Sequence, residues 1–281
     1  MQTELLDGIT RIIMTTWRSR LVGYSVSAWF ARGVLVDTGF PAAAARFAAA
    51  LDALRPSVVL LTHQHEDHAG NADLVARRGI PLVAAASTLA AIRDPQPMAL
   101  YRRFCWGAMR PLRTPVSGGM PEGLELIHSP GHSFDHHVVW DAERGVLFAG
   151  DLYLGVKVRV ARPGENPRAL SESLHRIAAL QPRRMFDAHR GEVMQPVEAL
   201  LAKARWLDDT IGRIDQHDDE GRDERMITRS VLGREDIIAV ISAGDLARAN
   251  FVRAVRATRP GRASSASPEQ SRPAEAAPRT R

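Results

Sequence analysis

The sequence predicts a layered α/β fold that continues into a helical C-terminal region. Short apolar, β-branched runs alternate with helix-type patterns over the first 195 residues, and such alternation is typical of sheets covered by helices. Because 45% of the 281 residues are apolar, the chain can bury a sizeable core. We expect one domain over 1–195, a helical extension over 196–258, and a disordered Pro- and Ser-rich tail over 259–281.

The expected strands are short, and several of them close on Gly, Asp or His. β-Branched and aromatic residues favour strands because their side chains pack well on a pleated surface. The segment 57–63 is apolar over nearly its whole length, which indicates a buried strand. In chain order, the strands are expected at 9–15, 25–31, 33–39, 57–63, 80–86, 124–130, 137–141, 145–151 and 184–191.

The expected helices are marked by their composition and their ends. The segment 41–54 is rich in Ala and opens with Pro at a helix-start position. A second helix over 69–79 stops at a Gly, and a third covers about 168–180. From 195 onward the helical pattern continues to about 257, while residues 94–122 mix Pro, Gly, Arg and aromatics without a clear pattern.

Composition and charge narrow the class of protein. The net charge is +5, but five Arg and two Glu in 259–281 account for +3 of it, which leaves about +2 on the rest. This argues against a nucleic-acid partner. Cys105 is the single cysteine, so disulfides and Cys-rich zinc sites are excluded. No signal peptide and no run of about 18 apolar residues is found, so we expect no membrane partner and a cytoplasmic location.

The segment 61-LTHQHEDHAG-70 crowds histidines and acids at the end of an expected strand. His63 and His65 are two residues apart, so in an extended segment they point the same way and can reach one ion. Asp67 and His68 follow where the next helix starts and can face a second ion. Imidazole nitrogens and carboxylate oxygens both suit Zn²⁺ and related ions, so the pattern predicts a metal site.

Three further polar residues sit at the ends of other expected strands. They are His132 in 130-PGH-132, Asp151 in 150-GD-151 and His189 in 188-AH-189. Loops at strand ends are where sites are built on a rigid sheet. A catalytic ion needs about three protein ligands and an open position, and these residues could complete the set.

Taken in order, these segments resemble the metallo-β-lactamase-fold hydrolases. The signature of that family is His-x-His-x-Asp-His, then a His after Pro-Gly, then Gly-Asp, then a final His, and it is matched here over about residues 9–195. The resemblance implies an αββα sandwich with extra C-terminal helices and two metal ions at one edge. The implied ligands are His63, His65 and His132 for one ion, Asp67, His68 and His189 for the other, and Asp151 as a bridge. Asp37 in 36-VDTG-39 would support the metal loop.

The resemblance also implies a metal-dependent hydrolase. Two ions about 3.5–4 Å apart can share a water and lower its pKa, which yields hydroxide at neutral pH. Asp67 could relay a proton. We expect zinc, with iron or manganese as alternatives, and a small-molecule ester, thioester or lactone as substrate. A phosphodiesterase or ribonuclease on the same site, and a mononuclear iron dioxygenase acting on persulfides, are the alternatives.

The remaining candidates carry weaker signals. Asp135 and His136 could support the ligands from outside or could simply enter the next strand, and Tyr153 is a candidate substrate residue two positions after the bridging acid. Glu66 is expected to be a solvated loop residue. The segment 101–113 mixes aromatics with Arg and fits either a loop over the metal edge or a helix with a basic solvent face. The C-terminal helices are expected to wall the substrate pocket or to mediate a homodimer.

Overall fold

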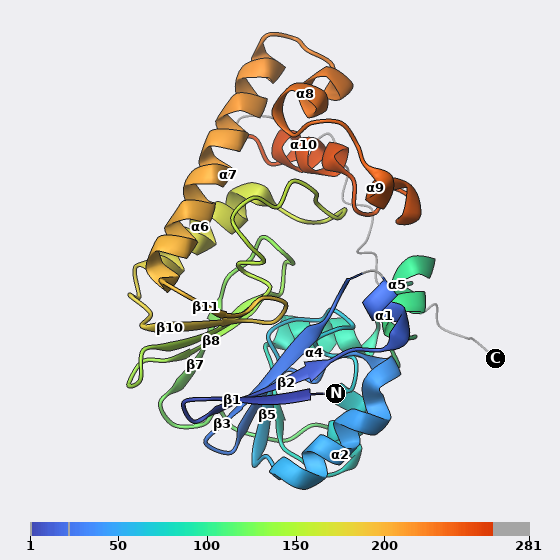
Figure 1. The fold of residues 1–281 in the computed structure, drawn as a ribbon, viewed down its shortest axis with the longest axis vertical. Coiled ribbons are helices and arrows are strands. Elements are labelled where there is room, and N and C mark those ends of the chain that lie inside the picture. The colour runs from blue at the N-terminus through green and yellow to red at the C-terminus, as the bar shows by residue number, and fades with distance from the viewer. Residues whose placement is uncertain (1, 22, 261–281) are drawn as a thin grey trace, which may run out of the picture.

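Two β-sheets packed face to face form the centre of the molecule, and helices cover both outer faces (Figure 1). The computed structural model describes residues 2–21 and 23–260. The predicted tail lies outside the described residues from position 261 onward. Every helix of the described residues is too short or too polar to cross a membrane.

The first sheet has six strands in sequential order. They are β1 (Gln2–Leu6), β2 (Ile9–Met14), β3 (Val26–Ala31), β4 (Val34–Val36), β5 (Val58–Leu60) and β6 (Leu82–Val83). The pairs from β1 to β4 are antiparallel, whereas β4, β5 and β6 are parallel. The predicted strands are confirmed here, although β4, β5 and β6 end earlier than expected because the chain turns into the loops of the site.

The second sheet has five strands in the order β11-β10-β9-β8-β7. They are β7 (Leu124–His128), β8 (His137–Asp141), β9 (Val146–Gly150), β10 (Arg184–Asp187) and β11 (Gly191–Val193). β9 and β10 are parallel and the other pairs antiparallel. Their shared direction brings the carboxyl ends of β9 and β10 to one edge.

Side chains of successive residues enter different layers of the core. In β4, Val34 and Val36 face the second sheet while Leu35 packs under the helices. In β9, Phe148 packs between the sheets and Leu147 against the other helical layer. These strands are therefore buried on both faces, which is why they are apolar without alternation. The layers follow the order helix, sheet, sheet, helix, so the predicted αββα sandwich is confirmed.

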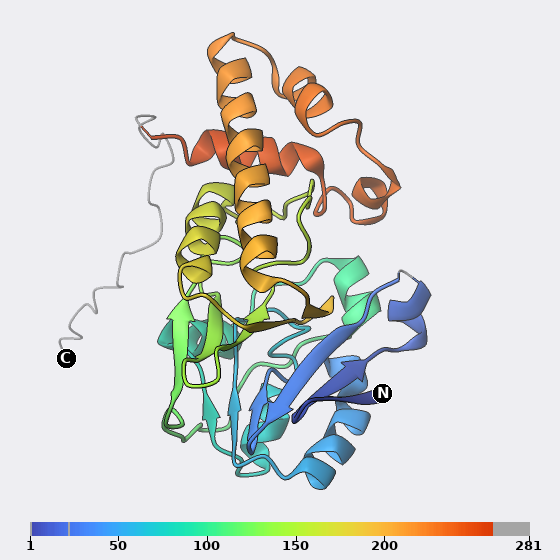
Figure 2. The ribbon, with the colours of Figure 1, turned by 60° about the vertical axis from the view of Figure 1, so that its left-hand side comes forward.

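The helices divide between the two outer faces. On the first sheet lie the 3₁₀ turn Pro41–Ala43, α2 (Ala44–Leu54), α3 (Ala72–Arg77), α4 (Ala86–Arg93) and α5 (Leu100–Trp106), with α1 (Trp17–Leu21) beside α5. On the second lie α6 (Pro167–Ala178) and α7 (Pro196–Asp219), followed by α8 (Glu224–Val231), α9 (Ile237–Ile241) and α10 (Arg248–Ala257). Figure 2 shows α7 (orange) rising away from the sheets, with α10 (red) crossing it near the middle.

The C-terminal helices share a core with the second sheet. Leu200 and Leu207 of α7 pack in one apolar cluster with Leu147 of β9 and Leu174 of α6, and Phe251 of α10 belongs to the same cluster. The first part of the extension proposed from residue 196, in α7, thus belongs to the outer helical layer of the sandwich, and α8 and α10 pack on α7. Its separation as a domain stays a prediction.

Candidate metal centre

The motif loop after β5 is held from behind by Asp37. The backbone N–H of Thr62 donates to Asp37 Oδ1 at 2.8 Å, and the Thr62 hydroxyl donates to the same carboxylate at 2.9 Å. His68 Nδ1 lies 2.8 Å from Asp37 Oδ2. Asp37 adopts a left-handed backbone with φ of 65°, which acids and amides tolerate better than most residues. This buried carboxylate fixes both ends of the motif.

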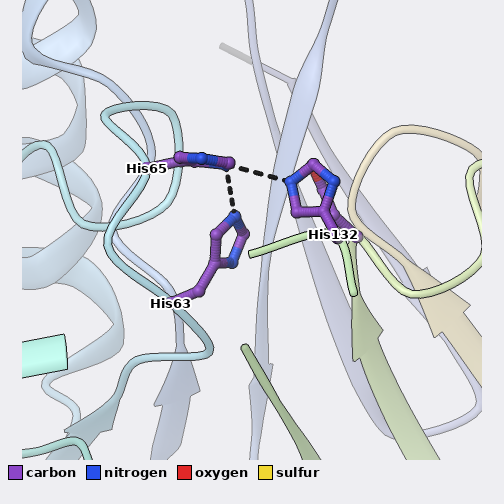
Figure 3. A group of neighbouring side chains, drawn as sticks. His63, His65 and His132 are labelled. Atoms are coloured by element: carbon purple, nitrogen blue, oxygen red, sulfur yellow. Dashed lines mark hydrogen bonds and ion pairs between the residues drawn. The ribbon is translucent and has the colours of Figure 1, made fainter. Parts of the chain in front are cut away.

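The first cluster gathers three histidines and one acid. His65 Nδ1 lies 2.9 Å from His63 Nε2 and 2.9 Å from His132 Nε2, so three ring nitrogens converge on one point (Figure 3). Asp151 contributes an oxygen to the same group, with all four donor atoms within 4.8 Å of one another. Such convergence of nitrogen and oxygen donors is the geometry of a metal site.

The second cluster consists of Asp67, His68 and His189, and it adjoins the first through Asp151. Oδ1 of Asp151 lies 3.2 Å from His68 Nε2 and 3.3 Å from His189 Nε2. Its other oxygen, Oδ2, lies 3.2 Å from His132 Nε2. Each oxygen of this carboxylate therefore faces a different cluster. The structure brings together all seven residues that the sequence predicted as ligands.

Gly150 allows Asp151 to reach this position. A Cβ atom on Gly150 would lie 2.8 Å from His136 Nε2 and 3.1 Å from the Thr62 side chain. Its φ of 51° also favours glycine. The Gly-Asp pair thus reflects a close approach of backbone to the motif loop.

The outer nitrogens of the histidines are held by other groups. His63 Nδ1 contacts the Thr62 hydroxyl at 3.0 Å, and His189 Nδ1 donates to the carbonyl of Ser25 at 2.7 Å. His132 Nδ1 lies 3.7 Å from Glu165. The hydrogen bonds of His63 and His189 fix the orientation of these two rings and leave their inner nitrogens free to bind a cation, whereas His132 Nδ1 and Glu165 are too far apart for a hydrogen bond.

The buried donor atoms fit a divalent cation. Oδ1 of Asp67, Nε2 of His68 and Oδ1 of Asp151 are buried and have no hydrogen-bond partner among the described residues. Buried polar atoms without partners are costly, and a cation would satisfy all three. The donors are nitrogen and oxygen without sulfur, a set that suits Zn²⁺ and also iron or manganese.

Protonation differs between the clusters. Burial, together with the neighbouring histidines, lowers the pKa of His63 and His65, and burial lowers the pKa of His132 to about 3. These rings are neutral, as a metal ligand requires. Burial alone would lower the pKa of His189, but Asp151 and Asp67 raise it to about 10. Cation binding at the second cluster must therefore displace protons, and it should weaken as the pH falls.

Asp135 and His136 lie directly behind the predicted ligands. Asp135 accepts hydrogen bonds from the backbone N–H of Gln64 and from the Thr88 hydroxyl, both at 2.9 Å. His136 Nε2 accepts from the backbone N–H of Asp151 at 3.1 Å. β8 begins only at His137, so neither residue belongs to the strand. Their contacts support the role of holding the ligand-bearing backbone.

The expectation that Glu66 is solvated is wrong. Its side chain is 3% exposed and forms a two-point ion pair with Arg102, in which Nε donates at 2.6 Å and Nη2 makes the second contact. This pair anchors α5 over the motif loop. The segment 101–113 was expected to be either a loop over the metal edge or a helix with a basic solvent face, and the structure combines parts of both. The segment is helical through Trp106, and Arg102 faces the metal edge rather than water.

Tyr153 gains no support as a substrate residue. Its side chain packs against the cluster shared by α7 and the second sheet. A small cavity adjoins His132 and Asp151, and its lining includes Leu154 and Lys203 but not Tyr153. The role of Tyr153 stays a prediction.

Lys203 is a buried residue that the sequence reading missed. It lies on α7, and its ammonium donates to the carbonyls of Leu152 (3.0 Å) and Tyr153, directly after Asp151. Lys203 and Lys157 are the lysines of the chain. The sequence could not predict these hydrogen bonds, because the two carbonyls lie about fifty positions before the lysine.

Replacing Lys203 with Met should change how stability depends on pH. Burial lowers the pKa of Lys203 from 10.5 to about 8. Between these values the unfolded chain holds a proton that the folded chain has lost, so the free energy of unfolding should rise with pH by up to about 3 kcal/mol. Urea unfolding at pH 7.5 and 10 should show this gain in the unchanged chain and in the control Lys157→Met. A gain of equal size in Lys203→Met would contradict the assignment.

The sandwich and its edge of histidines and acids define the class of protein. The model of the Metallo-beta-lactamase superfamily matches residues 22–211. The chain belongs to this superfamily and is a metal-dependent hydrolase.

Known relatives and structures agree with this assignment. A Beta-lactamase-like protein 2 homolog of Drosophila melanogaster is 26% identical over 220 residues, which is 69% of this chain and 70% of the relative. An "Acyl-coenzyme A thioesterase MBLAC2" of Bos taurus is 28% identical over 183 residues, 53% of this chain and 64% of the relative. This chain thus covers less than two thirds of that thioesterase. The crystal structure of a metallo-beta-lactamase family protein from Thermus thermophilus has the same fold, with a TM-score of 0.64, 19% identity, and coverage of 90% of this chain and 96% of that one.

Proposed function

We propose that the two clusters hold two divalent ions and that the chain hydrolyses a small thioester, ester or lactone. His63, His65 and His132 would hold one ion, and Asp67, His68 and His189 the other. The observation that carries the proposal is Asp151, because its two oxygens face the two clusters separately. The mononuclear iron dioxygenase stays an alternative, because an intact second cluster is compatible with it.

The ions would supply Lewis acidity and would lower the pKa of a water molecule between them. The protein supplies orientation and proton handling. Asp67 is ionised, because its contact with His189 and the neighbouring His68 hold its pKa well below the ordinary value although burial opposes this. Its Oδ1 has no hydrogen-bond partner among the described residues and would bind a cation at the second cluster; the proton relay expected of Asp67 stays a prediction. Asp37 and His136 hold His68 and Asp151 in place.

Thioesters are the first substrate class to test. The bovine relative is named an acyl-coenzyme A thioesterase, and the donor set fits acyl transfer to water without a protein nucleophile. Zinc is the expected ion because the donors are histidine nitrogens and carboxylate oxygens. Iron and manganese suit the same donors.

Elemental analysis of the full chain, purified without chelator, tests the proposal. We expect about two ions per chain and a clear decrease in His68→Ala. The same preparations should be assayed on thioesters, lactones, simple esters and phosphodiesters. Absence of metal from the unchanged chain would refute the proposal. A content of one iron per chain, unchanged in His68→Ala, would favour the dioxygenase.

Weakening the support behind His68 should loosen the second ion. In Asp37→Asn, the left-handed backbone is tolerated, but the carboxylate that orients His68 is lost. Loss of such a supporting group typically weakens metal binding by about 10–100-fold. Competition with a chromophoric chelator measures this, with the exposed Asp52→Asn as control. Equal affinity in Asp37→Asn and the unchanged chain would show that Asp37 does not support the ligand.

A further inference from the structure

A tight turn between β9 and α6 aims two charged side chains at the metal centre. The turn is Arg162-Pro163-Gly164-Glu165, and the N–H of Glu165 donates to the carbonyl of Arg162 at 3.1 Å. Pro at the second position and Gly with φ of 93° at the third are the residues that a type II turn requires. Arg162 and Glu165 therefore lie at the two ends of one rigid turn.

The turn is fixed against the C-terminal helices. Ala161 pairs with Ala247, just before α10, and the side-chain amide of Asn250 donates to the Ala161 carbonyl at 3.1 Å. At the other end, the N–H of Asn166 donates to the Gly131 carbonyl at 2.7 Å, next to the ligand His132. These contacts hold the backbone of Arg162 in place without using its side chain.

The guanidinium of Arg162 stands beside the first cluster. Its Nη1 lies 3.4 Å from His65 Nδ1, the nitrogen on which His63 and His132 converge. Among the described residues, no carboxylate lies within ion-pairing distance of this guanidinium, whereas Glu66 is already paired with Arg102. Residue Arg162 as a whole is of intermediate exposure.

The balance of charges around Arg162 favours the binding of an anion beside the first cluster. A guanidinium keeps its charge in proteins, so Arg162 stays charged, and Asp67, Glu66 and Glu165 are the acids that act on it electrostatically. Two divalent ions at the clusters would offset the charges of Asp67 and Asp151 and leave Arg162 beside a positive centre. An anionic group on a bound molecule would then be attracted by both. The planar fork of a guanidinium matches carboxylate and phosphate groups.

We propose that Arg162 is the specificity-determining residue of the site and that it selects substrates with a carboxylate or phosphate group close to the scissile bond. This rests on the proposed hydrolase function and narrows its substrate class. Neutral esters and lactones that lack such a group are expected to be poor substrates. Arg159, which is exposed on the same connecting segment, offers a matched control of equal charge.

Calorimetric titration of the metal-loaded full chain with inorganic phosphate tests the proposal without an assay of activity. Arg162→Gln should weaken phosphate binding by about tenfold or more, the range of a hydrogen bond to a charged partner. Arg162→Lys should retain part of the affinity, and Arg159→Gln should match the unchanged chain. The metal content of every variant is measured in the same preparation.

The outcomes separate the two proposals. Equal phosphate affinity in Arg162→Gln and the unchanged chain, at equal metal content, would overturn the role of Arg162 and leave the hydrolase proposal standing. An unchanged chain that takes up no metal would refute the hydrolase proposal itself. A second test compares kcat/KM for two esters that differ only by a carboxylate. The preference for the charged ester should decrease about tenfold in Arg162→Gln, mainly through a higher KM. An unchanged preference would also overturn the role of Arg162.

Discussion

Replacing Asp151 with Asn should remove metal from both clusters and reduce hydrolysis by about 10³-fold or more. Asp151 is the residue whose oxygens face both groups, at 3.2–3.3 Å from His68, His189 and His132. An amide has the same shape but lacks the charge that balances two divalent ions. Several kcal/mol of transition-state stabilisation from the ions would be lost, which corresponds to the stated factor. Elemental analysis and turnover of the best thioester measure the two effects.

Asp141 provides a control for this substitution. It is also a buried acid on the second sheet, but it lies at the end of β8, where it accepts a hydrogen bond from the N–H of Arg144. Asp141→Asn should keep about two ions per chain and its activity. If Asp151→Asn kept both ions as well, Asp151 could not be the residue that joins the clusters.

The metal centre could be predicted because its signals are local. His63, His65, Asp67 and His68 occur within six residues, so their mutual geometry follows from one short loop. His132, Asp151 and His189 each follow a Gly or Ala at a strand end, where an apolar run stops abruptly. The strands β4, β5 and β9 were visible because they are buried along their whole length and therefore apolar throughout.

The contacts around the centre could not be predicted, because they join distant segments. Glu66 and Arg102 are 36 positions apart, and neither carries a sign of the other. The same holds for Lys203 and the carbonyl of Leu152. β1 was missed because its residues are nearly all exposed, so the segment lacks the apolar pattern that would predict a strand. The contacts that surround the two clusters therefore depend on tertiary structure, whereas four of the seven predicted ligands lie in one short motif.

The ion pair between Glu66 and Arg102 should make a large, asymmetric contribution to stability. Glu66 is 3% exposed and Arg102 15%, so removing the arginine leaves a buried carboxylate without its partner. Loss of one member of a buried pair costs about 3–5 kcal/mol. We expect Arg102→Met to lower the free energy of unfolding by about this amount and Glu66→Gln by less, because the freed guanidinium can still reach water. Urea unfolding of the metal-loaded chain measures both changes.

The double variant Glu66→Gln with Arg102→Met completes the test. Replacing both members of a buried pair is often close to neutral, since no charge is left without a partner. The double variant should therefore be more stable than Arg102→Met alone, and the two single effects should not add. Additive losses would mean that the pair contributes nothing through its charges. Glu66 stands between the predicted ligands His65 and Asp67, so Arg102→Met should also weaken metal binding. A variant of the exposed neighbour, Arg103→Met, should change neither the free energy of unfolding nor the metal affinity.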